Sequence, residues 1–138
     1  MSIEHVQQPW GSPASYSQAV ATEALIFTCG QLGVDAGGAE VSFEVQADTA
    51  LRRLVAVIQA AGGSIETIVK VNGYLADLSD FPAYDRIYRE ILAISPMPAR
   101  TTVQIAAFPP PILVEVDAVA VRRAAGLAPA SEIREEES

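Results

Sequence analysis

The chain has 138 residues, of which half are apolar and 19% are charged, and its formal net charge is −8. This length fits a single domain, the composition excludes disorder over most of the chain, and the apolar runs are too short to span a membrane. The single cysteine excludes an internal disulfide, and an acidic chain without a basic cluster argues against a nucleic-acid partner.

Residues 1–15 are expected to form an extended lead-in, because prolines and glycines interrupt them. They have neither the basic start nor the apolar segment of a secretory signal, so we expect a cytoplasmic protein. Two short apolar runs at residues 16–20 and 25–29 then predict a β-hairpin. The glycine-rich residues 30–38 are expected to be irregular.

Two helices are predicted where apolar residues recur every three or four positions. The first begins at Ser42, a favourable N-cap, and ends before Gly62. The second has Pro82 in its first turn and ends at Ser95-Pro96. Their apolar faces are Ala50, Leu54, Val57, Ile58 and Ala61 in the first helix, and Tyr84, Ile87, Tyr88, Ile91 and Leu92 in the second.

Three further strands are predicted. Residues 68–76, between the two helices, begin with β-branched side chains, and alternating apolar runs follow at residues 101–106 and 113–121. Arg100 directly precedes the first of these runs, and Glu115 lies near the start of the second. We expect these two strands to be neighbours in the sheet. Each would then carry one charged residue, Arg100 or Glu115, at the edge of a pocket.

The order of the elements predicts an α+β fold with a mixed β-sheet and two helices packed on one face. Residues 1–123 are expected to form one domain, and residues 124–138 a flexible acidic tail. The apolar strand positions are too numerous to lie on one face under two helices, so we expect an oligomer to cover the other face. These positions are Val103, Ile105, Val114, Val116, Ala118 and Ala120.

Seven short motifs occur along the chain in a specific order. The strongest are Pro98-Ala99-Arg100-Thr101-Thr102-Val103 and Val114-Glu115-Val116-Asp117-Ala118-Val119-Ala120, and the others are Tyr16-Ser17-Gln18-Ala19-Val20, Phe27-Thr28-Cys29-Gly30-Gln31, Ala60-Ala61-Gly62, Val69-Lys70-Val71 and Asp80-Phe81. With them the chain resembles the RidA/YjgF family of reactive-intermediate (enamine/imine) deaminases over nearly all of residues 13–123. The resemblance implies a chorismate-mutase-like α+β fold that assembles as a homotrimer, with three pockets between subunits.

The resemblance also implies roles for individual residues. Arg100 would hold a substrate carboxylate, and Glu115 would order or activate the water that attacks the imine carbon. Tyr16 would line the pocket, and Cys29 and Gly30 would lend backbone contacts. A planar guanidinium matches a carboxylate, and a carboxylate near a bound water can act as a general base. No metal and no cofactor are expected, because a protonated imine is already an electrophile.

Three positions depart from the family pattern. Thr102 stands where many deaminating members have cysteine, and Asp85 stands where asparagine is frequent. Both remain in the predicted substrate-binding set, although an acid beside an anionic substrate is unfavourable unless it points away. Ala14-Ser15 replaces the usual Gly-Pro before the tyrosine. We expect these changes to alter substrate preference.

The predicted function is that of an enamine/imine deaminase, a hydrolase that converts 2-iminopropanoate or 2-iminobutanoate to 2-keto acids and ammonia. Its partners would be a small anionic imino or keto acid and further copies of the chain. A non-catalytic protein that binds small carboxylates in the same pocket is an alternative. A ribonuclease or translation inhibitor is a third, and the acidic charge of the chain weighs against it.

Overall fold

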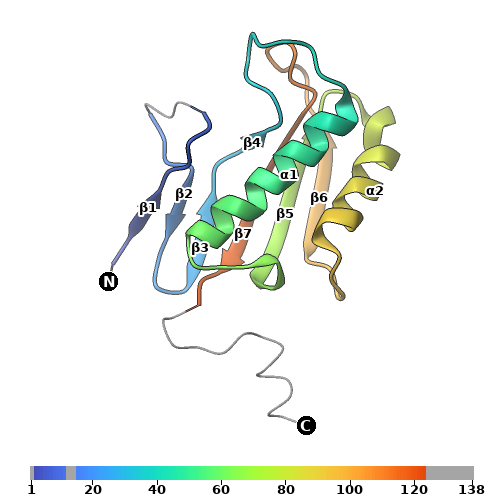
Figure 1. The fold of residues 1–138 in the computed structure, drawn as a ribbon. Helices are drawn as coiled ribbons and strands as arrows, with labels where there is room; N and C mark the ends of the chain where they lie inside the picture. The colour runs from blue at the N-terminus through green and yellow to red at the C-terminus, as the bar shows by residue number, and fades with distance from the viewer. Residues whose placement is uncertain (1, 12–14, 124–138) are drawn as a thin grey trace.

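The computed structural model describes residues 2–11 and 15–123. It is an α+β structure in which one mixed β-sheet carries both α-helices on the same face, as predicted (Figure 1). The strands are β1 (Glu4–Val6), β2 (Ala19–Ala21), β3 (Leu25–Thr28), β4 (Gln31–Leu32), β5 (Ile68–Leu75), β6 (Ala99–Gln104) and β7 (Val114–Val121). The helices are α1 (Phe43–Ala60) and α2 (Phe81–Leu92), with short 3-10 turns at Ile65–Thr67 and Leu78–Asp80. None of the helices in the described residues has the length and apolar character needed to cross a membrane.

The strand order is β1-β2-β3-β7-β5-β6, and β4 pairs with β7 beside β3. The prediction that β6 and β7 are neighbours is wrong, because β5 lies between them. β5 and β6 run parallel and are joined through α2, as a parallel pair requires a crossover. β7 runs antiparallel to β5, so β6 and β7 begin at opposite ends of the sheet.

Both predicted helices are present, and their predicted apolar faces point into the core. Oγ of Ser42 accepts a hydrogen bond from the backbone N–H of Val45 and caps α1. All five predicted apolar positions of α1 are buried, and those of α2 are buried except for the partly buried Ile91. α2 ends at Leu92, before the predicted Ser95-Pro96, because Ala93 adopts the left-handed conformation.

Two strands occur where the sequence predicted none. β1 lies within the expected lead-in and pairs with β2, and β4 lies within the expected irregular segment. Each is too short, at three and two residues, for an alternating pattern to be detected. Residues 12–14 of the lead-in and the predicted tail at 124–138 lie outside the described residues.

The two faces of the sheet differ in what covers them. On β7, Val114, Val116, Ala118 and Ala120 are buried under the helices, so these four of the six apolar strand positions share one face. The alternate side chains of β7 point to the other face, which we call the open face. Its other described members include Phe27, Lys70, Asn72, Tyr74 and Val103, which the strand register places beside them. Phe27 and Val103 are 45% and 41% exposed, so this face keeps apolar surface in contact with solvent.

Candidate active site

Arg100 lies on the helix-covered face of β6, at the edge of the sheet. It is the register partner of the buried Val71, which fixes the face to which it points. Its Nη1 donates to Oδ1 of Asp85 on α2 at 2.7 Å, and the side chain is 25% exposed. The rings of Phe81 and Tyr88 lie 5.2 and 4.9 Å from its Cζ, within cation–π distance. The guanidinium is therefore held between one carboxylate and two aromatic rings.

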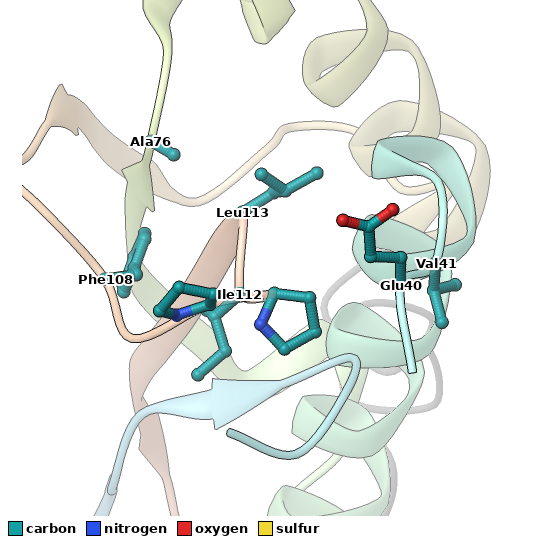
Figure 2. A pocket seen from close by; sticks show the side chains of 8 residues that line it. Glu40, Val41, Ala76, Phe108, Ile112 and Leu113 are labelled. Carbon is teal, nitrogen blue, oxygen red and sulfur yellow. The ribbon is translucent and has the colours of Figure 1, made fainter. Parts of the chain in front are cut away.

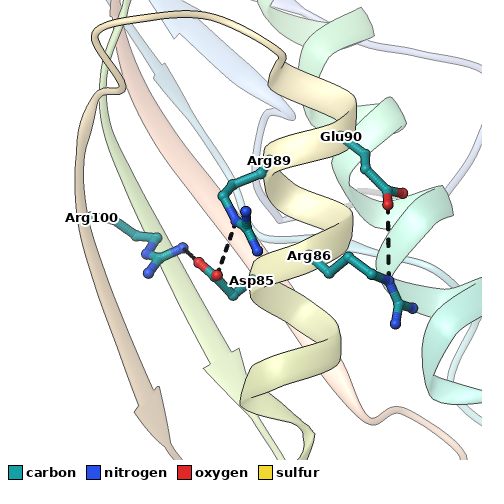
Figure 3. A network of polar contacts seen from close by, with 5 residues as sticks. All are labelled: Asp85, Arg86, Arg89, Glu90 and Arg100. Atoms are coloured by element: carbon teal, nitrogen blue, oxygen red, sulfur yellow. Dashed lines mark hydrogen bonds and ion pairs between the residues drawn. The ribbon is translucent and has the colours of Figure 1, made fainter.

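Asp85 is shared between two arginines (Figure 3). Its second oxygen accepts from Nε of Arg89 at 3.1 Å, one helical turn further along α2. The hydrogen bond from Arg100 holds the pKa of Asp85 below its ordinary value, so the carboxylate is charged at neutral pH. Asp85 thus points toward Arg100, which is the orientation that the sequence analysis identified as unfavourable for an anionic substrate.

Thr102 lies on the same face as Arg100, two residues along β6. It is the register partner of Gly73, and the hydroxyl of Tyr84 lies so close to Gly73 that a Cβ there would be 2.7 Å from it. Burial raises the pKa of Tyr84, which keeps its hydroxyl protonated. Arg100, Thr102 and Asp85 therefore form one group, which we call the arginine half-site.

Glu115 lies on the open face near the start of β7, beside Tyr74 of β5. Burial raises the pKa of Glu115 above its ordinary value, and the nearby charge of Asp117 raises it further. Asp117 is held in place because Oδ1 accepts from Asn72 Nδ2 at 2.8 Å and Oδ2 accepts from the Tyr74 hydroxyl at 2.9 Å. Burial and this hydrogen bond raise the pKa of Tyr74 to about 12.

Cys29 and Gly30 interrupt the pairing with β7 between β3 and β4, both of which pair with β7. At this interruption the Gly30 backbone lies against Glu115. A Cβ added to Gly30 would be 2.5 Å from the carboxyl carbon of Glu115. Burial raises the pKa of the Cys29 thiol, so the thiol remains protonated at neutral pH. The position of Gly30 therefore explains why a residue without a side chain is needed beside Glu115.

Tyr16, Cys29 and Gly30 line one small cavity of about 40 Å³, together with Trp10 and Gln31 among others. This space admits a water molecule but no substrate. Nε1 of Trp10 donates to Oε1 of Gln31 at 2.8 Å, which ties the lead-in to β4.

The four predicted residues Tyr16, Cys29, Gly30 and Glu115 are thus neighbours, and we call them the glutamate half-site.

The structure does not bring Arg100 and Glu115 together within one chain. They point to opposite faces of the sheet, and β5 lies between their strands. Arg100 pairs with Val71 and Glu115 pairs with Tyr74, so strand spacing and rise put their Cα atoms about 14 Å apart. The predicted site is therefore split into the arginine half-site and the glutamate half-site.

Sequence reasoning missed Asp117, Asn72 and Tyr74 as neighbours of Glu115. One signal was present for Asp117, because residues two apart on a strand share a face. The hydrogen bonds from Asn72 and Tyr74 depend on the pairing of β5 with β7, which no local pattern indicates.

A larger cavity of about 480 Å³ lies at the triple-proline turn (Figure 2). Its lining is mostly apolar, with Glu40 at one side: Glu40, Val41, Ala76, Phe108, Pro110, Pro111, Ile112 and Leu113. The buried Gln46 connects its walls by donating to the carbonyls of Val41 and Pro111 and by accepting from the N–H of Leu113.

Comparison with known proteins identifies relatives over most of the chain. The family model described as endoribonuclease L-PSP matches residues 7–122. A RutC family protein of Synechocystis is 38% identical over 125 residues, which cover 88% of this chain and 96% of the relative. The human 2-iminobutanoate/2-iminopropanoate deaminase is 36% identical over 115 residues, covering 81% and 83% respectively.

Solved structures also share the fold. The crystal structure of TdcF from Escherichia coli with bound serine superposes with a TM-score of 0.73 at 31% sequence identity. The match covers 82% of this chain and 92% of the TdcF chain. The sequence and structural matches therefore agree on one family and one fold.

Proposed function

This chain belongs to the RidA/YjgF family, and from that membership and its two half-sites we propose that it is an enamine/imine deaminase. It would hydrolyse reactive 2-imino acids of the 2-iminopropanoate type to 2-keto acids and ammonia. The relative named 2-iminobutanoate/2-iminopropanoate deaminase supports this reaction, and the TdcF structure with bound serine supports a ligand that carries a carboxylate. The observation that carries the proposal is Glu115, a half-buried carboxylate with a raised pKa directly against the backbone of Gly30.

The proposed active site is completed by a second copy of the chain. Arg100 and Glu115 point to opposite faces, so one substrate can contact both only if they come from different subunits. A ring in which the arginine half-site of each subunit meets the glutamate half-site of the next satisfies this geometry, and a trimer is the ring we propose. The exposed apolar side chains of the open face, such as Phe27 and Val103, are suited to contact between subunits.

Arg100 would bind the substrate through the N–H groups that Asp85 leaves free. One donor of Nη1 is taken by Asp85, and the remaining donors of the fork can contact a carboxylate or carbonyl oxygen. The rings of Phe81 and Tyr88 restrict the motion of the guanidinium, so little side-chain entropy is lost on binding.

Glu115 would act as the general base. A water held between Glu115 and the imine carbon loses a proton to the carboxylate as its oxygen forms the new C–O bond, and the C=N electron pair moves to nitrogen. From a protonated imine this step gives a carbinolamine, and the protonated Glu115 returns its proton to the nitrogen. Glu115 then takes the proton of the new hydroxyl group as the C=O bond forms and the C–N bond breaks, and the departing ammonia carries that proton away as ammonium. A raised pKa suits the first step, because it makes the carboxylate of Glu115 a stronger base than that of an exposed glutamate.

The chemistry needs no thiol. Cys29 stays protonated because its pKa is raised, and Thr102 provides a hydroxyl in place of the cysteine that the family resemblance implies for many members. Thr102 is on the arginine half-site and would contact the substrate end that Arg100 binds. We therefore assign Thr102 to substrate preference.

A non-catalytic carboxylate-binding role is the second candidate, and the departures from the family pattern at Thr102, Asp85 and Ala14-Ser15 motivate it. The contact between Asp85 and Arg100 weighs against it. A guanidinium that already has a carboxylate partner binds a second carboxylate less strongly. The ribonuclease function in the description of the family model has no comparable support. The one histidine of the chain, His5, is exposed on β1 and hydrogen-bonded to Ser17 at 2.8 Å, and the net charge of −8 opposes binding of RNA.

The test is release of ammonia and keto acid from freshly generated 2-iminopropanoate. We expect the wild type to accelerate hydrolysis, and Arg100→Ala and Glu115→Gln to lose most of that acceleration. Saturable stabilisation by keto acids without any acceleration would favour the binding role. Equal rates in the wild type and in Glu115→Gln would remove Glu115 from the reaction.

A further inference from the structure

Arg100 already has a carboxylate partner, although the proposed function uses it to bind a carboxylate. The distance from Nη1 of Arg100 to Oδ1 of Asp85 is 2.7 Å, and both side chains are largely shielded from solvent, at 25% and 29% exposure. The rings of Phe81 and Tyr88 prevent the guanidinium from turning away freely. Any ligand at Arg100 therefore meets a guanidinium that is fixed beside a negative charge.

Arg89 does not cancel this negative charge. It pairs with the other oxygen of Asp85, but its side chain is 62% exposed, so solvent and salt screen its charge more strongly. Asp85 stays ionised at neutral pH because the hydrogen bond from Arg100 lowers its pKa. The negative charge of Asp85 therefore acts on Arg100 from 2.7 Å with little compensation from Arg89.

We infer that Asp85 is a specificity-determining residue that disfavours a full carboxylate at Arg100 relative to an uncharged carbonyl, such as that of an amide or ester. The inference rests on the proposed function, because it takes Arg100 as the substrate-binding group. A ligand carboxylate on the free side of the guanidinium lies one guanidinium width from Asp85, and the two negative charges repel. A neutral carbonyl oxygen accepts from the same N–H groups without this repulsion.

Compared with an uncharged side chain at this position, Asp85 would therefore reduce the margin by which Arg100 favours the carboxylate of a 2-imino acid over an uncharged carbonyl group. Asparagine at this position would keep a hydrogen-bond acceptor for Arg100 without the charge. Aspartate and asparagine thus differ in charge but hardly in shape. One substitution therefore measures the effect of the charge on ligand binding.

The Asp85→Asn variant tests the inference. Binding of pyruvate and of its uncharged amide, pyruvamide, is measured from the ligand dependence of thermal unfolding, which requires no turnover. We expect Asp85→Asn to bind pyruvate about tenfold more tightly and to change pyruvamide binding by less than about twofold. Glu90→Gln is the matched control, because Glu90 is on the same helix and pairs with Arg86 at 3.9 Å, away from Arg100 (Figure 3). Asp85→Ser is a second neutral variant for which the same direction is expected.

Three outcomes would overturn the inference. The first is that Asp85→Asn binds pyruvate no more tightly than the wild type does. The second is that Asp85→Asn gains the same affinity for pyruvamide as for pyruvate. The third is that neither ligand has a saturable effect on the thermal unfolding of any of these proteins. The Arg100→Ala variant separates this inference from the proposed function. Loss of pyruvate binding in Arg100→Ala with no gain in Asp85→Asn would reject only the role of Asp85. Unchanged pyruvate binding in Arg100→Ala would contradict the substrate-binding role of Arg100 itself.

Discussion

Arg100 and Glu115 lie on opposite faces of the same β-sheet, Arg100 under α2 and Glu115 on the open face. Their strands are separated by β5 and begin at opposite ends of the sheet. Under the proposed function, a single chain therefore presents two half-sites, one on each face. This relationship makes assembly a requirement of the proposed chemistry.

Gly30→Ala should reduce activity with little effect on stability. The added Cβ would lie 2.5 Å from the carboxyl carbon of Glu115, so the flexible end of that side chain must move. A displacement of the base by about 1 Å can cost on the order of 100-fold in rate. We expect kcat for 2-iminopropanoate to fall at least about tenfold. A variant with wild-type kcat would show that the contact between Gly30 and Glu115 is irrelevant to the reaction.

Asp117→Asn should shift the acidic limb of the pH–activity profile to lower pH. The charge of Asp117 contributes to the raised pKa of Glu115, and the base is active only when ionised. Removing that charge lowers the pKa of Glu115, so the ionised form persists to lower pH. The measurement is kcat/KM from about pH 4 to pH 9. Asp48→Asn, which changes an exposed ion pair with Arg52 on α1, is the charge control, and an equal shift in that variant would contradict the assignment.

The raised pKa of Glu115 also has a consequence for stability. A carboxyl group whose pKa is higher in the folded state binds more protons there, so stability falls as pH rises through the interval between the unfolded and folded pKa values. Glu115→Gln should therefore be more stable than the wild type at neutral pH, and this gain should vanish below the pKa of the unfolded state. Thermal unfolding of both proteins at pH 3 and at pH 7 measures this difference in stability. The pKa of a glutamate in the unfolded chain is ~4, between these two pH values. Equal differences at both pH values would contradict the raised pKa.

Gln46→Leu should destabilise the fold. The buried amide of Gln46 makes three hydrogen bonds to backbone groups of Val41, Pro111 and Leu113, and leucine would leave those groups without their partner. We expect the free energy of unfolding to fall by about 2–4 kcal/mol, measured by urea denaturation. Gln59→Leu, at an exposed position of the same helix, is the control and should change stability by less than about 0.5 kcal/mol.

The sequence predicted local structure well and spatial relationships poorly. The buried faces of α1 and α2 followed from apolar spacing because each is a property of a single helix. The position of β5 between β6 and β7 depends on a crossover through α2, and adjacency in the sequence suggested the opposite. The motifs identified Arg100 and Glu115 as candidate site residues. The contact of Arg100 with Asp85 joins a strand to a helix, so it is visible only in the three-dimensional structure.

Mixed oligomers of Arg100→Ala and Glu115→Gln subunits test most directly whether the site is shared between copies of the chain. Each variant alone is expected to be inactive, since every site lacks one of the two groups. In a ring assembled at random from equal amounts of both, about a quarter of the interfaces combine an intact Arg100 with an intact Glu115. Co-assembled protein should therefore recover about a quarter of the wild-type rate of 2-iminopropanoate hydrolysis. A mixture that stays as inactive as its components, although mixed oligomers have formed, would contradict a site shared between subunits.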